Sequence, residues 1–267
     1  MEQEVKNILI KLYDITKSPL TFFDIESTGL DKVSDDIIQL YLCNYDGQDF
    51  IEKNQYFNTD IYTTSATMAF DKHGLTNDFL SDYPYFIEQA KGIYEKYFFK
   101  GTVLCGYRSN NFDIPFIVEK LLQSEITKAV NILQNKRIDV YDIYANLFPN
   151  TLDKVYGRIV GGDMGVSHEA KNDVVATIKI LDKLTNGSID TSDIDIVTTS
   201  NTVDSDEFFR REGNEIFFAK GKYKDENILK MDKNDSLGFL RWITRTKTIS
   251  IHSRTIANKI IDKIENN

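Results

Sequence analysis

The chain is poor in the residues that crosslink or stiffen a small extracellular domain. Its 267 residues include two cysteines, four prolines, three histidines and one tryptophan. Cys43 and Cys105 each lie in an apolar, strand-like run, which favours buried free thiols over a disulfide. Free thiols are typical of a reducing compartment, so we expect a cytoplasmic protein.

Long hydrophobic runs are missing as well. The apolar stretches stop well short of the ~20 residues that span a bilayer, and no signal-peptide pattern opens the chain. We therefore expect no membrane partner. Hydrophobic residues still make up 41% of the chain, which is enough for a sizeable core, and the length favours one large domain plus a small one.

Basic charge is scarce overall but gathers near the C-terminus. The formal net charge is −9, yet residues 210–259 carry 12 basic against 6 acidic residues, a net of +6. Residues 186–207 hold six acids and no basic residue, a composition that predicts a solvated linker, although Ile194–Val197 leaves room for an added strand. The basic part is the better candidate for attracting phosphates. The expected division is 1–185, 186–207 and 208–267.

The most informative stretch is an apolar strand that ends in two acids, Leu20-Thr-Phe-Phe-Asp24-Ile25-Glu26-Ser27-Thr28-Gly29. Alternate side chains of a strand point to the same face, so Asp24 and Glu26 project together. Adjacent carboxylates repel, and burial raises the cost of charging both. A hard divalent cation removes that cost, which makes the pair a candidate Mg²⁺ or Mn²⁺ site. A strand end whose acids face water is the plain alternative.

Two further acids lie at predicted helix starts. Asp113 opens a helical pattern that follows the strand-like run Val103–Cys105. His168 stands before another helical pattern, and Asp173 lies about one and a half turns inside it. In that position Asp173 can hold a metal while the imidazole of His168 reaches over it. Taken singly, each acid also fits an ordinary helix-start residue.

Together the three segments resemble the DEDDh family of 3′→5′ exonucleases, which includes the epsilon proofreading subunits of bacterial replicases. The family pattern is Asp-x-Glu-x-Thr-Gly, then Phe-Asp opening a helix, then His-x-Ala-x-x-Asp. The chain has Asp24-Ile-Glu26-Ser-Thr28-Gly29, Phe112-Asp113 and His168-Glu-Ala170-Lys-Asn-Asp173 in that order. The resemblance covers roughly residues 18–185.

The hydrophobic patterns favour an α/β fold, and the resemblance implies a ribonuclease H-like five-stranded mixed sheet flanked by helices, plus a small basic C-terminal module. The segments Phe217-Phe218-Ala-Lys220-Gly221-Lys222-Tyr223-Lys224 and Leu237-Gly-Phe239-Leu240-Arg241-Trp242 look like a module appended to exonuclease X-like proteins. We expect strands at 20–26, 36–45, 49–57, 102–106 and 137–141, and helices at 2–16, 63–70, 75–80, 84–99, 112–123, 142–148, 151–160 and after His168.

The resemblance implies a metal-dependent exonuclease that releases nucleoside 5′-monophosphates from the 3′ end of nucleic acid. Single-stranded or frayed DNA ends are favoured over RNA. Two Mg²⁺ or Mn²⁺ ions would be held by Asp24, Glu26, Asp113 and Asp173, and His168 would act as general base. The expected substrate-binding residues are Ile25, Thr28, Gly29, Leu30, Met68, His73, Gly74 and Asn111, with Leu30 as a wedge beside the last base.

Two other functions remain open. The chain could be an exonuclease subunit of a larger nucleic-acid-processing complex, a proofreading or trimming partner that docks through the helix at 2–16 or the C-terminal module. It could also be an inactive nucleic-acid-binding module, although the intact set of four acids and a histidine argues against that. In the basic module, we expect Trp242 to lie in a miniature core rather than to stack on bases.

Overall fold

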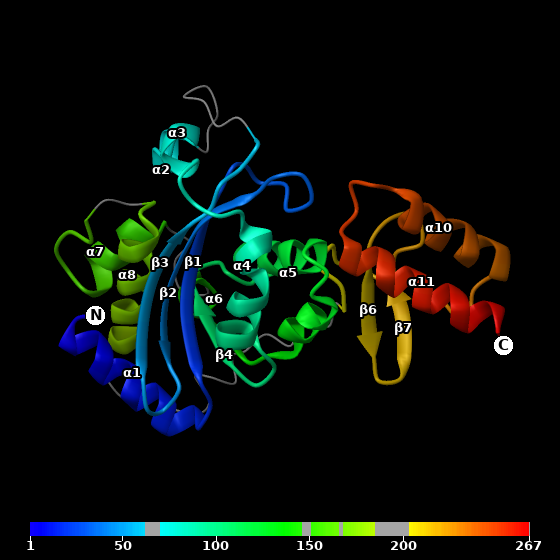
Figure 1. Cartoon of the computed structure of the whole chain (residues 1–267). Coiled ribbons are helices and arrows are strands. Elements are labelled where there is room, and N and C mark those ends of the chain that lie inside the picture. The colour runs from blue at the N-terminus through cyan, green and yellow to red at the C-terminus, as the bar shows by residue number, and fades with distance from the viewer. Residues whose placement is uncertain (62–69, 146–150, 166–167, 185–202, 267) are drawn as a thin grey trace.

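The computed structural model describes residues 1–61, 70–145, 151–165, 168–184 and 203–266 (Figure 1). Most of the predicted helix at 63–70, including Met68, lies outside the described residues. The same holds for Ile194–Val197, so the added strand is not tested.

A mixed five-stranded sheet forms the centre of the larger part of the chain (Figure 1). Its order is β3-β2-β1-β4-β5, with β1–β2 and β2–β3 antiparallel and β1–β4 and β4–β5 parallel. This arrangement confirms the expected ribonuclease H-like fold. The strands are β1 (Leu20–Ser27), β2 (Ile37–Tyr45), β3 (Phe50–Tyr56), β4 (Val103–Gly106) and β5 (Arg137–Asp139).

The hairpin between β2 and β3 follows from its turn residues. Asp46 Oδ1 accepts hydrogen bonds from the backbone amides of Gln48 and Asp49, at 2.9 and 2.8 Å. Gly47 has a φ of +99°, a conformation that favours glycine, and the Tyr13 ring occupies the space that a side chain would need. Asp46 and Gly47 therefore form the turn that joins β2 to β3.

Helices cover both faces of the sheet, each over its own hydrophobic core. On one face lie α1 (Gln3–Thr16), α6 (Val140–Ala145), α7 (Leu152–Ile159) and α8 (Ala170–Leu184). On the other lie α4 (Phe86–Ile93), its continuation η1 (Tyr94–Phe98), α5 (Asp113–Gln123) and the 3-10 segment η2 (Thr127–Gln134). The short helices α2 (Phe70–His73) and α3 (Asn77–Leu80) follow β3.

The apolar face of α1 is used inside the molecule. Val5, Ile8, Leu9 and Leu12 are at most 2% exposed and belong to the core between the sheet and α8. This face is therefore not free to dock a protein partner. No helix in the described part of the chain is long and apolar enough to cross a membrane. Cys43 and Cys105 are buried free thiols, as expected.

Two differences from the predicted elements have a local cause. The strand predicted at 137–141 ends at Asp139, because its Oδ1 accepts the Tyr141 amide at 3.0 Å and starts α6. The segment η2 was not predicted, and it packs Ala129 and Ile132 under α5.

The C-terminal residues form a separate small core. The hairpin β6 (Phe209–Glu212) and β7 (Glu215–Phe218) packs with α10 (Lys233–Arg245) and α11 (Ile251–Glu265) around nine buried apolar residues (Figure 1). The prediction that Trp242 belongs to this core was wrong. Leu240 and Ile243 occupy the inner face of α10, so Trp242 is 50% exposed and stacks on Phe239 at 5.4 Å.

A buried carboxylate joins this module to the nuclease-like part. Glu119 of α5 is fully buried and accepts the Ile251 amide through both oxygens, at 2.9 and 3.1 Å, at the start of α11. Lys32 also forms an ion pair with Asp206 at 2.7 Å. Asp206 and Asp204 fall inside the predicted linker, yet they bond to Ser250 and Ser253 of the module. The division at 208 stays a prediction, and the packed chain extends back to at least Asp204.

We expect Glu119→Ala to lower the free energy of unfolding by about 1–3 kcal/mol, because a buried amide loses its acceptor. Urea denaturation measures this change. Glu119→Gln is the matched control, since its amide oxygen can still accept the Ile251 amide, and it should lose less. Equal stability of Glu119→Ala and the wild type would show that the interaction contributes nothing.

Candidate active site

β1 brings the first two acids to the face of the sheet that α8 covers. Phe22 shares that face and lies in the same core as the α8 residues, so Asp24 and Glu26, two and four positions further, point the same way. Asp24 and Glu26 are both partly buried. The alternation expected from the sequence is present.

Asp113 is tied to the backbone between those two acids. It is the first residue of α5, is 4% exposed, and accepts the Ile25 amide on Oδ1 at 3.1 Å. Ile25 therefore holds Asp113 through its backbone, and its own side chain is buried in the core.

The loop that delivers Asp113 depends on Asp139 at the end of β5. Its carboxylate accepts the amides of Arg108 and Asn110, at 2.8 and 2.9 Å. Gly106 is required before this loop, because a Cβ there would lie 2.6 Å from the Ser109 side chain. Sequence reasoning missed this role of Asp139, since it joins segments about 30 residues apart.

Asp173 lies in the first turn of α8, and His168 stands just before that helix. Asp173 Oδ2 accepts the His168 backbone amide at 3.3 Å, and His168 adopts a left-handed φ of +64°. The second oxygen, Oδ1, is buried and accepts no hydrogen bond from the described residues. A buried carboxylate oxygen without a donor is costly, so this atom calls for a cation.

The four acids share one electrostatic environment. Burial, reinforced by Asp113, Glu26 and Asp173, raises the pKa of Asp24 well above its usual range. Burial, then Asp173 and Asp113, raises the pKa of Glu26 to about 8. Burial is also the main cause that raises the pKa of Asp113 to about 7 and that of Asp173 to about 6. Four carboxylates that resist ionisation together form a site for positive charge.

This donor set fits hard divalent cations, which prefer carboxylate oxygens. The four acids fit such a cation for three reasons: they are at least partly buried, they repel one another, and Asp173 Oδ1 accepts no hydrogen bond from the described residues. Among the described residues, no three His, Cys, Asp or Glu side chains converge closely enough to form a ready-made metal cage.

The predicted general base is accessible and neutral. The His168 side chain is exposed, and partial burial of its ring, followed by the charge of Lys72, lowers its pKa below 6.5. Lys72 also opposes the raised pKa of Glu26. No motif in the sequence pointed to Lys72, which lies on the four-residue helix α2 next to predicted pocket residues.

The predicted substrate-binding residues lie in two surroundings. Thr28 is buried and structural: its hydroxyl accepts the Asp36 amide at 2.9 Å and donates to Asp35. Gly29 must be glycine, because the Asp35 carboxylate fills the place of a side chain. Leu30 is 78% exposed, which suits a wedge.

The remaining predicted contacts are only partly described. His73 is half-buried and accepts the Leu75 amide on Nδ1 at 2.9 Å across Gly74, whose φ is +68°. Asn111 is exposed in the loop before Asp113. Met68 lies outside the described residues.

The sheet order and the acid cluster define the class, a ribonuclease H-like nuclease. The profile of the exonuclease family (RNase_T) matches residues 21–181, which is more than half of the chain. The chain therefore belongs to this exonuclease family, and the resemblance found in its motifs is confirmed.

Individual relatives agree with this assignment. The chain is 29% identical over 172 residues to DNA polymerase III PolC-type of Bacillus subtilis, a match that covers 61% of the chain but 11% of the relative. E. coli Exonuclease I in complex with a dA16 oligonucleotide has a TM-score of 0.56 at 18% identity, covering 67% of this chain and 42% of that one.

Another Exonuclease I structure, one that suggests how processivity is achieved, has a TM-score of 0.56 at 17% identity and covers 94% of this chain and 68% of that one. At such identities the likeness shows a shared fold. The chain spans about a tenth of the curated relative and about two fifths of the bound Exonuclease I.

We expect Asp24→Asn to raise the melting temperature of the metal-free protein at pH 8. Because the folded-state pKa values of these acids are raised, their protonation stabilises the fold at low pH, and this stability is lost as pH rises from about 4 towards 8. Removing one buried charge removes part of that loss.

The same variant should gain less stability than the wild type from MgCl₂ or MnCl₂. Thermal melting with and without chelator at pH 5 and pH 8 measures both effects. Asp49→Asn, an exposed acid in the β2–β3 turn, is the matched control and should behave like the wild type. An equal response of Asp24→Asn and wild type to metal would contradict the assignment of Asp24 as a ligand.

Proposed function

We propose that this protein is a metal-dependent 3′→5′ exonuclease that hydrolyses phosphodiester bonds from the 3′ end of DNA and releases nucleoside 5′-monophosphates. The observation that carries the proposal is a set of four acids from β1, α5 and α8 that raise one another's pKa, one with a donor-free oxygen, in a chain of the exonuclease family.

In this proposal Asp24, Glu26, Asp113 and Asp173 hold two Mg²⁺ or Mn²⁺ ions. When bound, the ions supply Lewis-acid neutralisation of the phosphate charge and lower the pKa of water. His168 accepts the proton of the attacking water, a role that suits an accessible imidazole with a lowered pKa. The Ile25 amide donates a hydrogen bond to the Asp113 carboxylate and so keeps this proposed metal ligand in a fixed orientation.

The preference for single-stranded or frayed DNA ends rests on two points. The exposed side chain of Leu30 can wedge beside the last base, next to the backbone amide of Gly29. In addition, E. coli Exonuclease I, which shares the fold, was solved with single-stranded DNA oligonucleotides. His73 and Gly74, with Met68, would close the pocket around the terminal nucleotide.

A second candidate is an exonuclease subunit that acts within a larger nucleic-acid-processing complex. The match to a part of a replicative polymerase favours it. Co-purification of a polymerase or repair partner would distinguish this function from a free-standing enzyme.

Digestion of end-labelled single- and double-stranded DNA and RNA with Mg²⁺ or Mn²⁺ tests the activity. A 5′-labelled DNA strand should shorten one nucleotide at a time. Asp113→Ala should abolish cleavage, because it removes a metal ligand, while circular dichroism shows an intact fold. Turnover like that of the wild type, in chelator-treated protein resupplied with Mg²⁺, would contradict the metal-dependent mechanism.

His168→Ala should lower kcat about 10²- to 10⁴-fold, the usual contribution of a general base, while metal-induced thermal stabilisation persists. The wild-type rate should rise with pH as the imidazole loses its proton, and this limb should disappear in the variant. Steady-state kinetics between pH 5 and pH 9 measures both. An unchanged kcat and pH profile in the variant would contradict a general-base role and leave His168 as a residue at the start of a helix.

A further inference from the structure

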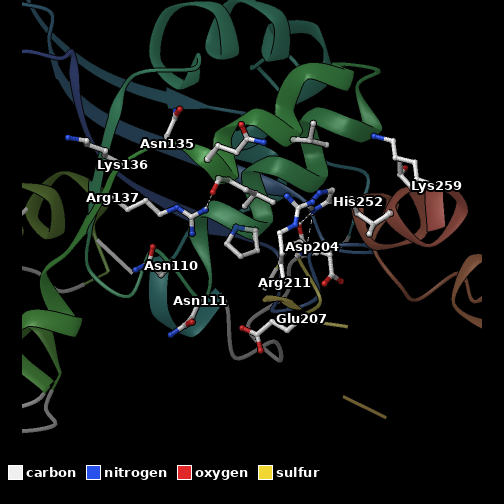
Figure 2. A pocket seen from close by; sticks show the side chains of 18 of the residues that line it. Asn110, Asn111, Asn135, Lys136, Arg137, Asp204, Glu207, Arg211, His252 and Lys259 are labelled. Atoms are coloured by element: carbon white, nitrogen blue, oxygen red, sulfur yellow. Dashed lines mark hydrogen bonds between the residues drawn. The ribbon is translucent and has the colours of Figure 1, made fainter. Parts of the chain in front are cut away.

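A large cavity lies between the nuclease-like part and the C-terminal module, outside the acid cluster. Its volume is about 1070 Å³, more than a single small ligand needs (Figure 2). Arg137 and Asn111 line it from the nuclease side, and Arg211, His252 and Lys259 line it from the module.

Arg137 on β5 is the unusual member of this lining. It is 9% exposed, and its Nη2 donates to the Leu133 carbonyl at 2.6 Å. No carboxylate of the described residues pairs with it, and burial lowers the pKa of its guanidinium. Figure 2 shows this side chain reaching from β5 into the space between the two parts. A buried guanidinium without a counter-ion is costly unless an anion binds to it.

The acids of the cavity are largely occupied by internal donors. Asp204 accepts the amides of Phe208 and Phe209 and the Ser253 hydroxyl. Asp142 accepts the Asn110 side-chain amide at 2.9 Å. Glu207 is the exposed exception.

The basic groups, in contrast, are uncommitted. Arg211 and Lys259 are exposed and form no ion pair with another described residue. His252 accepts the Ser205 amide, and burial lowers its pKa to about 4, so the ring stays neutral near pH 7. The cavity therefore offers Arg137, Arg211 and Lys259 to an anion, while two of its three acids, Asp142 and Asp204, are hydrogen-bonded internally.

The cavity also borders the loop that carries an active-site acid. Asn110 and Asn111 line it, and Asp113 follows two residues later. A ligand in the cavity can therefore be continuous with a nucleotide at the acid cluster. A polymer of phosphates fits both the size and this continuity better than a small anion does.

We propose that this cavity binds phosphate groups of the nucleic-acid strand whose 3′ end lies at the acid cluster, with Arg137 as the buried contact and Arg211 and Lys259 at the rim. The inference rests on the proposed function, because it takes the strand as substrate. The module thereby contributes to strand binding and takes no part in the chemistry.

The test is the affinity of a 5′-labelled 20-nucleotide single-stranded DNA, measured by fluorescence anisotropy in chelator so that no cleavage occurs. Arg211→Glu/Lys259→Glu should bind at least fivefold more weakly. Its salt dependence should also be shallower, with a slope smaller by about 0.7 for each phosphate that the variant no longer neutralises. The matched control is Lys224→Glu/Arg245→Glu, two basic residues of the module away from the cavity. It should stay within twofold of wild type.

Arg137→Gln adds a test of the buried contact, provided that its melting curve remains cooperative; it should also weaken binding. Unchanged affinity of the rim variant, or an equal loss in the control pair, would overturn the proposal. A rim variant that loses affinity for free nucleoside 5′-monophosphate but binds the 20-mer normally would also overturn it, since the cavity would then serve a free nucleotide.

Cleavage of a dinucleotide distinguishes failure of the proposed function, because its single phosphodiester is the one that is cleaved and no further phosphate remains for the cavity. Wild type, rim variant and control should cleave it alike in Mg²⁺. Absence of wild-type cleavage overturns the exonuclease proposal. Normal cleavage with unaltered 20-mer binding in the rim variant overturns the cavity proposal alone.

Discussion

The arrangement of the acid cluster rests on one hydrogen bond, from the Ile25 amide to the Asp113 carboxylate. Ile25 lies between Asp24 and Glu26, so this bond fixes the acid of α5 against both acids of β1. It can form because β1 and β4 are parallel neighbours and the loop after β4 returns to the end of β1. Asp139 holds that loop through two backbone amides, so the sheet edge and the acid cluster are parts of one constraint.

The parts of this site with local signals could be predicted from the sequence. Alternation in β1 places Asp24 and Glu26 on one face, and helix-start patterns place Asp113 and Asp173. The parts that depend on distant contacts could not. Asp139 looks like a strand residue, and its hydrogen bonds lie about 30 residues away. Lys72 influences the pKa values of Glu26 and His168 through its charge, which no sequence motif signals.

The C-terminal module shows the same limit. Aromatic residues in the sequence indicate a small core, but they do not tell which face of α10 points inward, so Trp242 was misplaced. The start of α11 is set by Glu119, which is 132 residues earlier in the chain. The sequence around a buried glutamate on an amphipathic helix does not indicate which distant residue it contacts.

The overall charge of −9 obscures how charge is used in this protein. Several acids are internally committed: Glu119 and Asp204 accept backbone amides, and the acid cluster suits cations. The hydrogen bonds stabilise the two buried carboxylates, and bound cations would neutralise the acid cluster. Arg137, Arg211 and Lys259, in contrast, meet at a cavity without carboxylate partners among the described residues. At physiological salt, screening limits the interaction between exposed charges to about 8 Å. A polyanion at the cavity therefore responds to the basic residues near it more than to the net charge of the whole chain.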